Sequence, residues 1–368
     1  MAFEPGQTVG DYEIIGKLGA GGLGVVYEVR HIISQRREAM KILRPDQSDT
    51  AEMAERFRRE VQTLAALNHV NIATLHTAFY NQNQLAMVME LVHGQTLRDR
   101  QLEAGITLPQ VLDIASQVLE ALVYAHGLGV VHRDIKPSNI MITGNRVVKL
   151  LDFGIARTEQ ASDLTKTGHL VGSLSYMSPE QVRGERVGAC SDLYSVGVTV
   201  YELLTGRLPI TGASNYDIMV GHMERVPVPP HKVAPSVPLA VSAAVMRVLE
   251  KDPVARFSAA LEFLTALRIA AQAQDTTTAS APLPRHVASV PRSSSGSVEQ
   301  KPHSESGFQT LSLDEVSRKL AIYIGPVAKF VVRKLAEQSQ DMDTIYREAA
   351  KQITSESDRA AFLRSRRQ

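Results

Sequence analysis

The sequence predicts an α+β protein in which a β-rich N-terminal part precedes a larger helical part. Short runs of β-branched and aromatic residues flank a glycine-rich segment within the first ninety residues. Apolar residues then recur at helical spacing in several segments between residues 96 and 271. A Ser-, Thr- and Pro-rich stretch separates a final helical segment from the rest.

Composition limits the classes of function. At 368 residues with 44% hydrophobic residues, the chain can bury a substantial core, and its net charge of +1 predicts no general attraction to nucleic acid or acidic membranes. The single Cys190 excludes an intrachain disulfide, as in a reducing cytosol, and we expect it to be a small buried residue rather than a reactive or metal-binding one. Neither a signal segment nor a run of eighteen apolar residues occurs. We therefore expect a cytoplasmic protein without a membrane span.

The first element is a glycine-rich loop with the pattern G-x-G-x-x-G-x-V over residues 19–26. Missing side chains let backbone amides approach phosphate oxygens. A dinucleotide-binding loop would need a helix at the last glycine. Here Tyr12 to Ile15 and Val25 to Arg30 are typical of strands, so the loop joins two strands and lies over phosphates.

A strand over residues 37–43 follows, with Lys41 between Met40 and Ile42. Such a lysine lies on a solvated strand face or binds a ligand. Residues 51–67 have helical composition, and Glu60 lies on this helix, where Glu52 and Glu55 compete with it by spacing alone. If Glu60 pairs with Lys41, the ammonium is held at the α- and β-phosphates of a nucleotide, and rotation of the helix would break the pair.

The segment His132 to Asn139, followed by Asp152-Phe153-Gly154, carries the chemistry. Its two carboxylates, amide and lysine have the spacing that phosphoryl transfer from a metal-nucleotide requires. Magnesium prefers oxygen ligands, which Asn139 and Asp152 supply. Asp134 then accepts or orients the proton of the attacking hydroxyl, and Lys136 neutralises the γ-phosphate. The alternative, a polar loop that only forms turns, is disfavoured by the DFG tripeptide and the upstream partners.

Two later helices form the core of the helical part. Residues 109–126 carry apolar residues at helical spacing, with proline near the start and Gly127 just past the end. A nearly all-apolar helix runs from Asp192 to Leu204, with Gly206 at its end; it is central and too short to span a bilayer. From sequence alone, Asp192 could simply be its N-terminal cap.

With these motifs in this order, residues 8–270 resemble the eukaryotic-like (Hanks-type) protein kinases, in particular their bacterial serine/threonine members. The resemblance implies a two-lobed fold with ATP in the cleft: a kinase domain over 1–271, with an N-lobe over about 8–89, a hinge at 90–95 and a C-lobe over 96–271. It makes Lys41 the lysine of V-A-I-K, Met89 the gatekeeper, and Glu90 and Val92 the residues that offer backbone groups to adenine. The expected ATP-site residues are Leu18, Gly19, Ala20, Gly21, Gly22, Gly24, Val26, Ala39, Lys41, Met89, Glu90, Val92, Asn139 and Asp152, with Val26 and Ala39 over the adenine face. The expected metal is Mg²⁺, held by Asn139 and Asp152, with Mn²⁺ as an alternative.

The resemblance also assigns structural roles. Ser178-Pro179-Glu180 resembles the A-P-E motif, whose glutamate would pair with Arg256, and Asp192 resembles the aspartate that accepts hydrogen bonds from the catalytic-loop backbone. The apolar stack that is continuous only in the active state would consist of Leu64, Leu75, His132 and Phe153.

Lys136, two residues after Asp134, goes with serine and threonine acceptors in this family. Ser138 stands where many arginine-directed kinases carry glutamate, so one carboxylate that would attract a basic substrate residue is absent. The chain also departs from the pattern at Ser173, Ser178 and Glu38, where the family usually has threonine, alanine and an apolar residue. None of these removes a chemical group from the mechanism, and Ser173 could still contact Asp134 and Lys136.

Arg133 beside Asp134 suggests regulation by phosphorylation. A cation there can pair with a phosphate on the segment between Asp152 and Glu180. Thr165 and Thr167 lie within it, and we expect autophosphorylation of at least one; the alternative is that both are ordinary loop threonines.

The C-terminal part divides into a flexible Ser/Thr/Pro-rich linker over 272–310 and a small helical module over 311–368. Helical patterns run over 313–324, 327–338, from Asp341 or Asp343 to Ile353, and from Ser355 or Ser357 to about Leu363. The module weakly resembles short helical modules of other bacterial signalling proteins. We expect a role in binding a signalling partner or in homodimerisation rather than a passive tail, with its basic residues a solvated face rather than a nucleic-acid site.

The predicted function is an ATP-dependent serine/threonine protein kinase in cytosolic signalling, acting on protein hydroxyls. A nucleotide-binding scaffold would be expected to lack Lys41, Asp134 or Asp152, and a small-molecule kinase to lack the segment that ends in Glu180. The sequence does not identify the physiological substrate or the activating signal.

Overall fold

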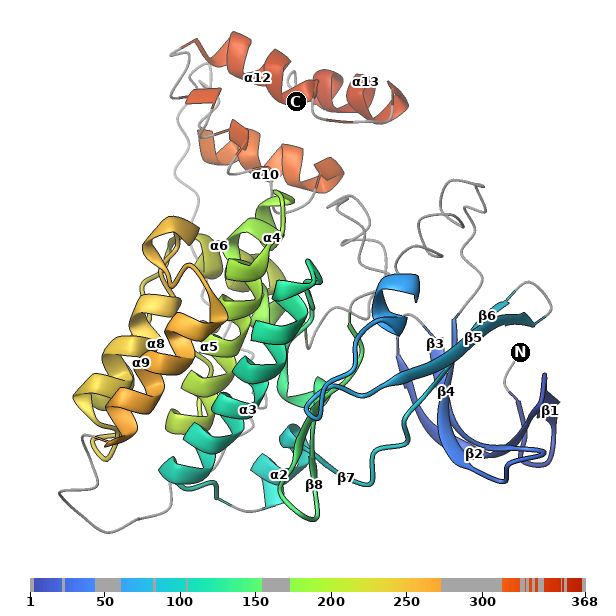
Figure 1. Cartoon of the computed structure of the whole chain (residues 1–368). Helices are drawn as coiled ribbons and strands as arrows, with labels where there is room; N and C mark the ends of the chain where they lie inside the picture. Colours follow the sequence, from blue (N-terminus) through green and yellow to red (C-terminus); the bar gives the residue numbers. More distant parts are fainter. Residues whose placement is uncertain are drawn as a thin grey trace, which may run out of the picture. The chain divides into compact units, whose positions relative to one another are not determined.

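The computed structural model describes residues 3–21, 24–43, 61–81, 84–103, 105–153 and 173–272, and then 313–324, 328, 331–332, 335–336, 341–351, 353 and 356–365. The chain divides into two compact units, residues 1–287 and 288–368. The larger unit has a β-rich lobe and a helical lobe, which confirms the predicted α+β, two-lobed class (Figure 1).

The small lobe is a six-stranded antiparallel sheet in the order β1-β2-β3-β4-β6-β5. Its strands are β1 (Thr8–Val9), β2 (Tyr12–Gly21), β3 (Gly24–His31), β4 (Arg37–Leu43), β5 (Leu75–Asn81) and β6 (Gln84–Met89). The predicted glycine-rich hairpin is β2–β3, and the predicted strand over 37–43 is β4. At Gly24 a Cβ atom would lie 2.2 Å from the carbonyl oxygen of Ile42, so only glycine allows β3 to start this close to β4.

Alternation in β4 separates a core face from a face that is open to ligand. Met40 and Ile42 pack into a cluster that includes Tyr27 and Val88. Ala39 and Lys41 therefore point to the opposite face of the sheet, because successive side chains alternate along a strand. This alternation places Lys41 where the sequence prediction needs it.

A second, three-stranded sheet connects the lobes, in the order β7-β8-β9. Its strands are β7 (Gly94–Thr96), β8 (Ile140–Thr143) and β9 (Val148–Leu150). The segment before β5 attaches to β9: the Ala73 amide donates to the Leu150 carbonyl at 3.0 Å, and the Leu150 amide to the Asn71 carbonyl at 2.9 Å. A stretch of the small lobe is thus fixed to the strand that leads into Asp152.

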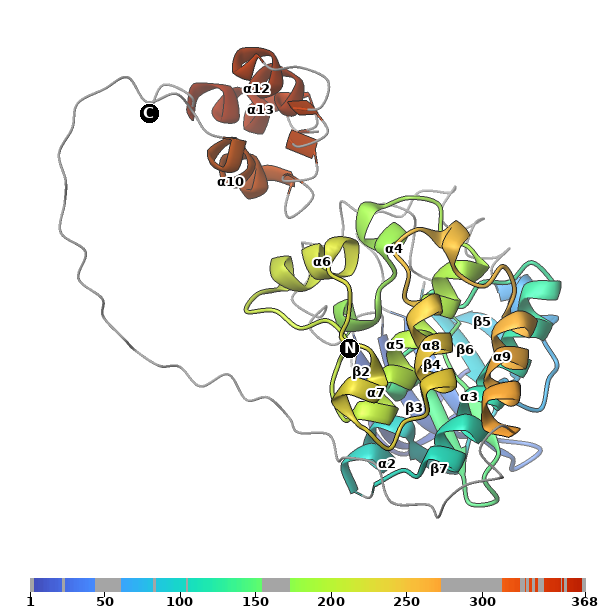
Figure 2. The same cartoon turned by 90° about the vertical axis from the view of Figure 1, so that its left-hand side faces the viewer.

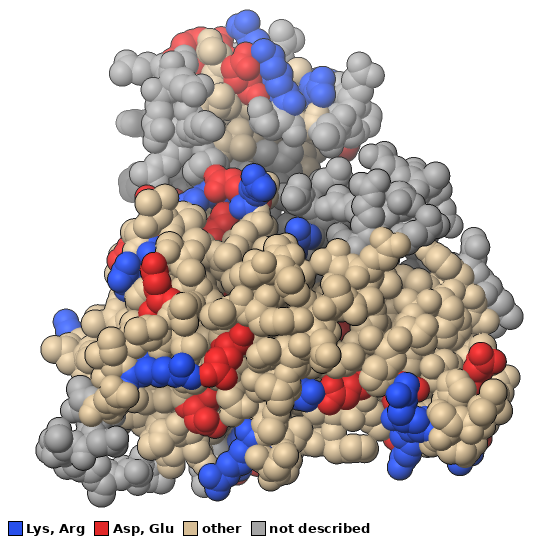
Figure 3. All heavy atoms as spheres, in the orientation of Figure 1, with Lys and Arg blue, Asp and Glu red and all other residues tan. Residues whose placement is uncertain are grey.

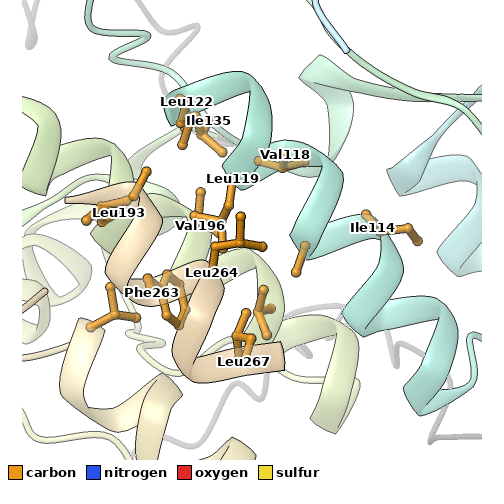
Figure 4. Close-up of a cluster of buried hydrophobic side chains, with 14 of the residues drawn as sticks. Ile114, Val118, Leu119, Leu122, Ile135, Leu193, Val196, Phe263, Leu264 and Leu267 are labelled. Carbon is orange, nitrogen blue, oxygen red and sulfur yellow. The ribbon is translucent and has the colours of Figure 1, made fainter. Parts of the chain in front are cut away.

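The large lobe is built around α5, whose residues are almost all buried. Figure 2 shows α5 among the other helices of this lobe. In Figure 4, side chains of α3 and α9 meet Val196 of α5 and Ile135 of the catalytic loop. The helices are α2 (Leu97–Glu103), α3 (Leu108–Gly127), α4 (Pro179–Arg183), α5 (Ala189–Thr205), α6 (Asn215–Glu224), α7 (Pro230–Val233), α8 (Leu239–Val248) and α9 (Ala260–Gln272).

Two helix boundaries differ from the prediction. α3 includes Gly127, which we had placed just past its end. α5 begins at Ala189 with Gly188 as its N-cap, so Asp192 lies inside the first turn and the capping interpretation of Asp192 is wrong. Gly206 ends α5 with a φ of 68°, as the predicted glycine stop requires.

The smaller unit contains α10 (Leu313–Ile324), α12 (Met342–Ala350) and α13 (Glu356–Arg364) around its own apolar core. Tyr346 stacks on Phe362 with ring centroids 4.4 Å apart, and Val316 and Leu320 of α10 are fully buried. Asp341, one of the two predicted caps, caps α12. Of the predicted linker only residue 272 lies within the described residues, as the end of α9; the break at 325–326 lies wholly outside them.

Acidic and basic side chains intermix over the described part of the face in Figure 3, rather than gathering by sign. No helix among the described residues has the length and apolar character needed to cross a membrane.

Candidate active site

Asp192 of α5 holds the catalytic loop by its backbone. Its two carboxylate oxygens accept from the His132 amide and the Arg133 amide, each at 2.8 Å, and its Oδ2 also lies 2.8 Å from Nε2 of His126. Asp192 is 1% exposed. Arg133 has a φ of 66°, a left-handed conformation that costs energy in a non-glycine residue and is held here by these bonds. The role that the resemblance implied for Asp192 is therefore confirmed.

Lys136 and Asn139 contact the carboxylate of Asp134, and Ser173 joins the group through Lys136. Lys136 Nζ lies 2.8 Å from Asp134 Oδ2 and 2.7 Å from the hydroxyl oxygen of Ser173. Asn139 donates its amide N–H to the main-chain oxygen of Asp134 at 2.8 Å and to Oδ2 at 3.1 Å. The side chains of Asp134 and Lys136 are 18% and 19% exposed, so a hydroxyl group can reach them.

Lys41 joins the sheet of the small lobe to Asp152. Its Nζ lies 2.7 Å from Oδ1 of Asp152, whose side chain is 36% exposed. The Leu151 amide donates to the Asn139 carbonyl at 2.9 Å, which places Asp152 beside the catalytic loop. Asp152 has a φ of 53°, a second left-handed non-glycine residue in the site.

The side chains of Asn139 and Asp152 fit a divalent cation. The Asn139 amide nitrogen is used as a donor to Asp134, which leaves its amide oxygen as the group that can ligate. Asp152 presents a half-exposed carboxylate. An amide oxygen and a carboxylate are hard ligands of the kind that Mg²⁺ and Mn²⁺ prefer.

The residues predicted to enclose adenine lie on β3, β4 and β6, next to the hinge. Ala39 is paired with Met89, and Val26 with Lys41, so these four residues lie at neighbouring register positions. The Glu90 amide donates to the Thr74 carbonyl at 2.9 Å, which leaves the Glu90 carbonyl as the group for a ligand. Among the other predicted ATP-site residues, Gly19, Ala20 and Gly21 end β2, Gly24 begins β3, Leu18 is 51% exposed, Val92 is half-buried in the hinge, and Gly22 lies outside the described residues.

His132 and Phe153 form the lower part of the predicted apolar stack. Their ring centroids are 4.5 Å apart, and His132 Nε2 lies 2.9 Å from the Leu151 carbonyl. Burial lowers the pKa of His132, so its ring is neutral and can pack against Phe153. Leu64 packs against the same core, and Leu75 is half-buried at the start of β5.

Glu180 and Arg256 form the predicted ion pair. Two nitrogens of Arg256 donate to the two carboxylate oxygens at 2.8 and 2.9 Å, and Ser191 donates to Oε1 at 2.7 Å. Burial alone would raise the pKa of Glu180, but hydrogen bonds and charge from Arg256 outweigh it and lower the pKa. This fork fixes the segment after Ser173 to the large lobe.

Several predicted residues cannot be placed. Glu60, Gly154, Thr165 and Thr167 lie outside the described residues, so the Lys41–Glu60 pair and the phosphorylation sites stay predictions. Ser173 is described and contacts Lys136 as expected.

Two contacts at the site were missed by sequence reasoning. Lys149 of β9 reaches the hinge, with its Nζ 2.8 Å from Oε2 of Glu90, and His126 contacts Asp192. Lys149 lies between two apolar residues of a strand, Val148 and Leu150, as Lys41 does in β4. That pattern could have identified it.

Comparison with known proteins supports this arrangement. The protein kinase domain family matches residues 12–266, and a domain of unknown function, DUF8082, matches residues 312–368. The serine/threonine-protein kinase PrkC of Bacillus subtilis is 38% identical over 252 residues, which is 68% of this chain and 39% of that protein. PknB of Mycobacterium leprae is 38% identical over 257 residues, 68% of this chain and 41% of that protein.

The chain spans about 40% of the length of these curated relatives. Among solved structures, the kinase domain of Mycobacterium tuberculosis PknI is similar with a TM-score of 0.60 and 28% identity, covering 74% of this chain and 100% of that one.

Proposed function

Because the chain belongs to the protein kinase family, we propose that it is an active serine/threonine protein kinase that transfers the γ-phosphoryl group of ATP to protein hydroxyls. The observation that carries this proposal is Lys136, whose Nζ bridges Asp134 and Ser173 at 2.8 and 2.7 Å. The bridge leaves a carboxylate and a cation side by side at a partly exposed point, as transfer to a hydroxyl requires.

The roles follow from the contacts. Asp134 orients the acceptor hydroxyl and takes its proton while oxygen attacks the γ-phosphorus and the bond to the ADP oxygen breaks. Lys136 stabilises the charge of the transferred group, and Lys41 holds the other phosphates. A divalent cation bound by Asn139 and Asp152 would neutralise further phosphate charge. Leu18, Val26, Ala39 and Met89 enclose adenine, and Glu90 and Val92 bind its edge through their main chains.

The decisive experiment measures transfer from labelled ATP to a generic protein acceptor with magnesium present. Asp134→Asn should abolish transfer, whereas Asp11→Asn, at an exposed position in the β1–β2 turn, should leave it unchanged. Label transferred equally by Asp134→Asn and the unsubstituted chain would refute the kinase proposal. Phosphoamino-acid analysis checks the acceptor class: serine and threonine, not tyrosine.

A nucleotide-binding scaffold is the main alternative. Such a scaffold would bind ATP but transfer no label to protein. Lys41→Met would then weaken the binding of ATP, and there would be no transfer for it to reduce. A small-molecule kinase would label no protein. The same assay with magnesium replaced by manganese, or with the cation chelated, tests the cofactor.

Autophosphorylation at Thr165 or Thr167 is proposed as the activating step. A phosphate there carries about −1.5 to −2 charges and can pair with Arg133. Phosphopeptide mapping should find at least one site in active protein, and the double alanine variant should lose activity. An unmodified segment in fully active protein would contradict this step.

The smaller unit is proposed to mediate binding of a signalling partner or homodimerisation, in a cytoplasmic setting. Its independent core, closed by Tyr346 and Phe362, supports a folded module rather than a passive tail. Sedimentation of the full chain and of a chain ending at Gln272 tests this role. If both chains sediment as monomers and capture the same partners, the smaller unit would be a passive helical tail.

A further inference from the structure

Helix α6 packs beneath the segment that follows Ser173. Ile218, Met219 and Met223 of α6 contact an apolar cluster formed by Leu174 and Met177 with Val182 of α4. The same segment is tied to the catalytic loop, because Lys136 contacts Ser173 and Gln181 donates to the Arg133 carbonyl at 2.8 Å. The segment that carries Ser173 beside Lys136 and Asp134 is therefore supported by α6.

One polar side chain of α6 points into the protein. His222 is fully buried, and its Nδ1 lies 2.9 Å from the hydroxyl of Tyr194 on α5. Its neighbour Gly221 has no room for a side chain, since a Cβ atom would lie 2.5 Å from Ile210. The helix is thus pressed against the lobe at the position of the histidine.

The contacts of Tyr194 define the protonation of the imidazole. Lys251 Nζ lies 3.4 Å from the Tyr194 hydroxyl oxygen and can only donate, so the tyrosine proton is free to point to Nδ1 of His222. The imidazole proton then lies on Nε2. Burial lowers the pKa of His222 to about 3, with Lys251 adding to the lowering and the main chain of Ser175 opposing it.

The Nε2 atom of His222 lies near the main chain of Ser175 but makes no well-formed hydrogen bond to it. Nε2 is buried, and among the described residues no group completes a hydrogen bond to it with good geometry. A buried donor left unpaired costs free energy, so a small approach of the Ser175 main chain would be favourable. Ser175 belongs to the segment that begins at Ser173, and this segment is the element that can move toward Nε2 of His222.

Tyr194 itself is rigidly held. Arg256 and Lys251 lie over its ring, 4.9 and 5.6 Å from the centroid, and the His222 ring meets it edge-on at 5.7 Å. Because Arg256 also binds Glu180, the side chains around Tyr194 are linked to the Glu180 end of the segment that follows Ser173.

We propose that His222 is a positioning residue for the protein acceptor. It lies between Tyr194 of α5 and the main chain of Ser175, and through these two contacts it fixes the distance between α5 and the segment that carries Ser173. This proposal rests on the proposed kinase function and concerns the acceptor only. None of the contacts that His222 makes with described residues involves the nucleotide site, so binding of ATP should not depend on it.

The test separates acceptor from nucleotide kinetics in the full chain. His222→Leu, which keeps bulk but removes both nitrogens, should raise the KM for a protein acceptor about tenfold, which corresponds to about 1.4 kcal/mol. The KM for ATP and kcat should stay within about twofold. His222→Gln, which restores a donor and an acceptor, should recover most of the loss.

Two further variants make the result decisive. Tyr194→Phe removes only the hydroxyl and should raise acceptor KM, with little added effect in the His222→Leu background. His231→Leu is the matched control, because Nδ1 of His231 on α7 lies 2.8 Å from the hydroxyl oxygen of Ser242 on α8. It should leave both KM values unchanged.

An unchanged acceptor KM in His222→Leu, or equal changes in both KM values and kcat, would overturn the proposal. Should that variant not fold, Tyr194→Phe decides by the same criteria. Absence of transfer by the unsubstituted chain would instead refute the proposed kinase function itself.

Discussion

Glu180 in the large lobe and Glu38 in the small sheet are both buried, with 4% and 0% exposed, yet they are stabilised in different ways. Both oxygens of Glu180 bind Arg256, which is itself 2% exposed. Glu38 uses one oxygen for His76 and for Arg36, whose side chain is 59% exposed, and its second oxygen has no partner among the described residues.

The comparison shows that burial alone does not define the contribution of a charge. A closed pair, cut off from water, cannot lose one member without leaving an uncompensated charge. A pair whose partners are accessible to solvent can lose one member, because water then hydrates the remaining charge. We therefore expect the acceptor side of the site to depend strongly on single buried contacts and the Glu38 position of the small sheet to tolerate substitution.

The largest effect should come from Arg256→Met. It leaves Glu180 buried and unpaired, and we expect the larger unit to lose about 3–5 kcal/mol of unfolding free energy. Urea denaturation measures it. Adding Glu180→Leu should recover most of the loss, and a cost for Arg256→Met below about 1 kcal/mol would abolish the contrast between the two glutamates.

A second prediction concerns Asp192, which accepts from two backbone amides. In Asp192→Asn the negative charge is lost, and the new NH₂ group faces a backbone N–H that it cannot accept from. We expect the unfolding free energy to fall by about 1.5–3 kcal/mol and kcat to be lower. Asp252→Asn is the control, since Asp252 caps a short exposed helix through Val254. Asparagine caps equally well, so that change should be nearly neutral.

Glu38→Val should change the unfolding free energy by less than about 1 kcal/mol, because its partners can be hydrated. Kinase activity should persist, since Ala39 and Lys41 point to the other face of the sheet. The same denaturation experiment checks stability. A cost equal to that of Arg256→Met would show that both glutamates are equally dependent on their partners.

The smallest effect is a pH dependence at Lys251, beside the Glu180–Arg256 pair. Burial lowers its pKa from 10.5 to about 8. Between these values the unfolded chain holds a proton that the folded chain has lost, so this group makes stability rise with pH over that interval. Lys251→Met should remove the rise, whereas Lys232→Met, at an exposed position, should keep it. Equal slopes in both variants would contradict the shift.

Local patterns predicted most elements. The glycine-rich hairpin, β4 and α10 follow from alternation, glycine spacing and helical periodicity, which are properties of neighbouring residues. Long-range partners were harder. Whether Asp192 was a cap or a support of the catalytic loop depended on residues sixty positions away, and only the family resemblance favoured the second.

Contacts that no motif encodes were missed. His222 lies in a helix of mixed character, and its importance appears only when α6 packs on α5, 28 residues earlier in the chain. Glu38 was recognised as a departure from the family pattern, but its partner His76 was not. A bulge between Leu75 and Thr77 in β5 turns His76 toward Glu38, and sequence alternation cannot predict a bulge.

That bulge has a mechanical consequence. Residues 71–73 are bonded to β9, and β7 is paired with β8, so both ends of the connection between the lobes are anchored to the large lobe. A rocking motion of the small sheet would then bend the backbone at Leu91 to His93 and at the bulge beside His76. These two short strips would act as pivots, while the strand that leads to Asp152 stays still.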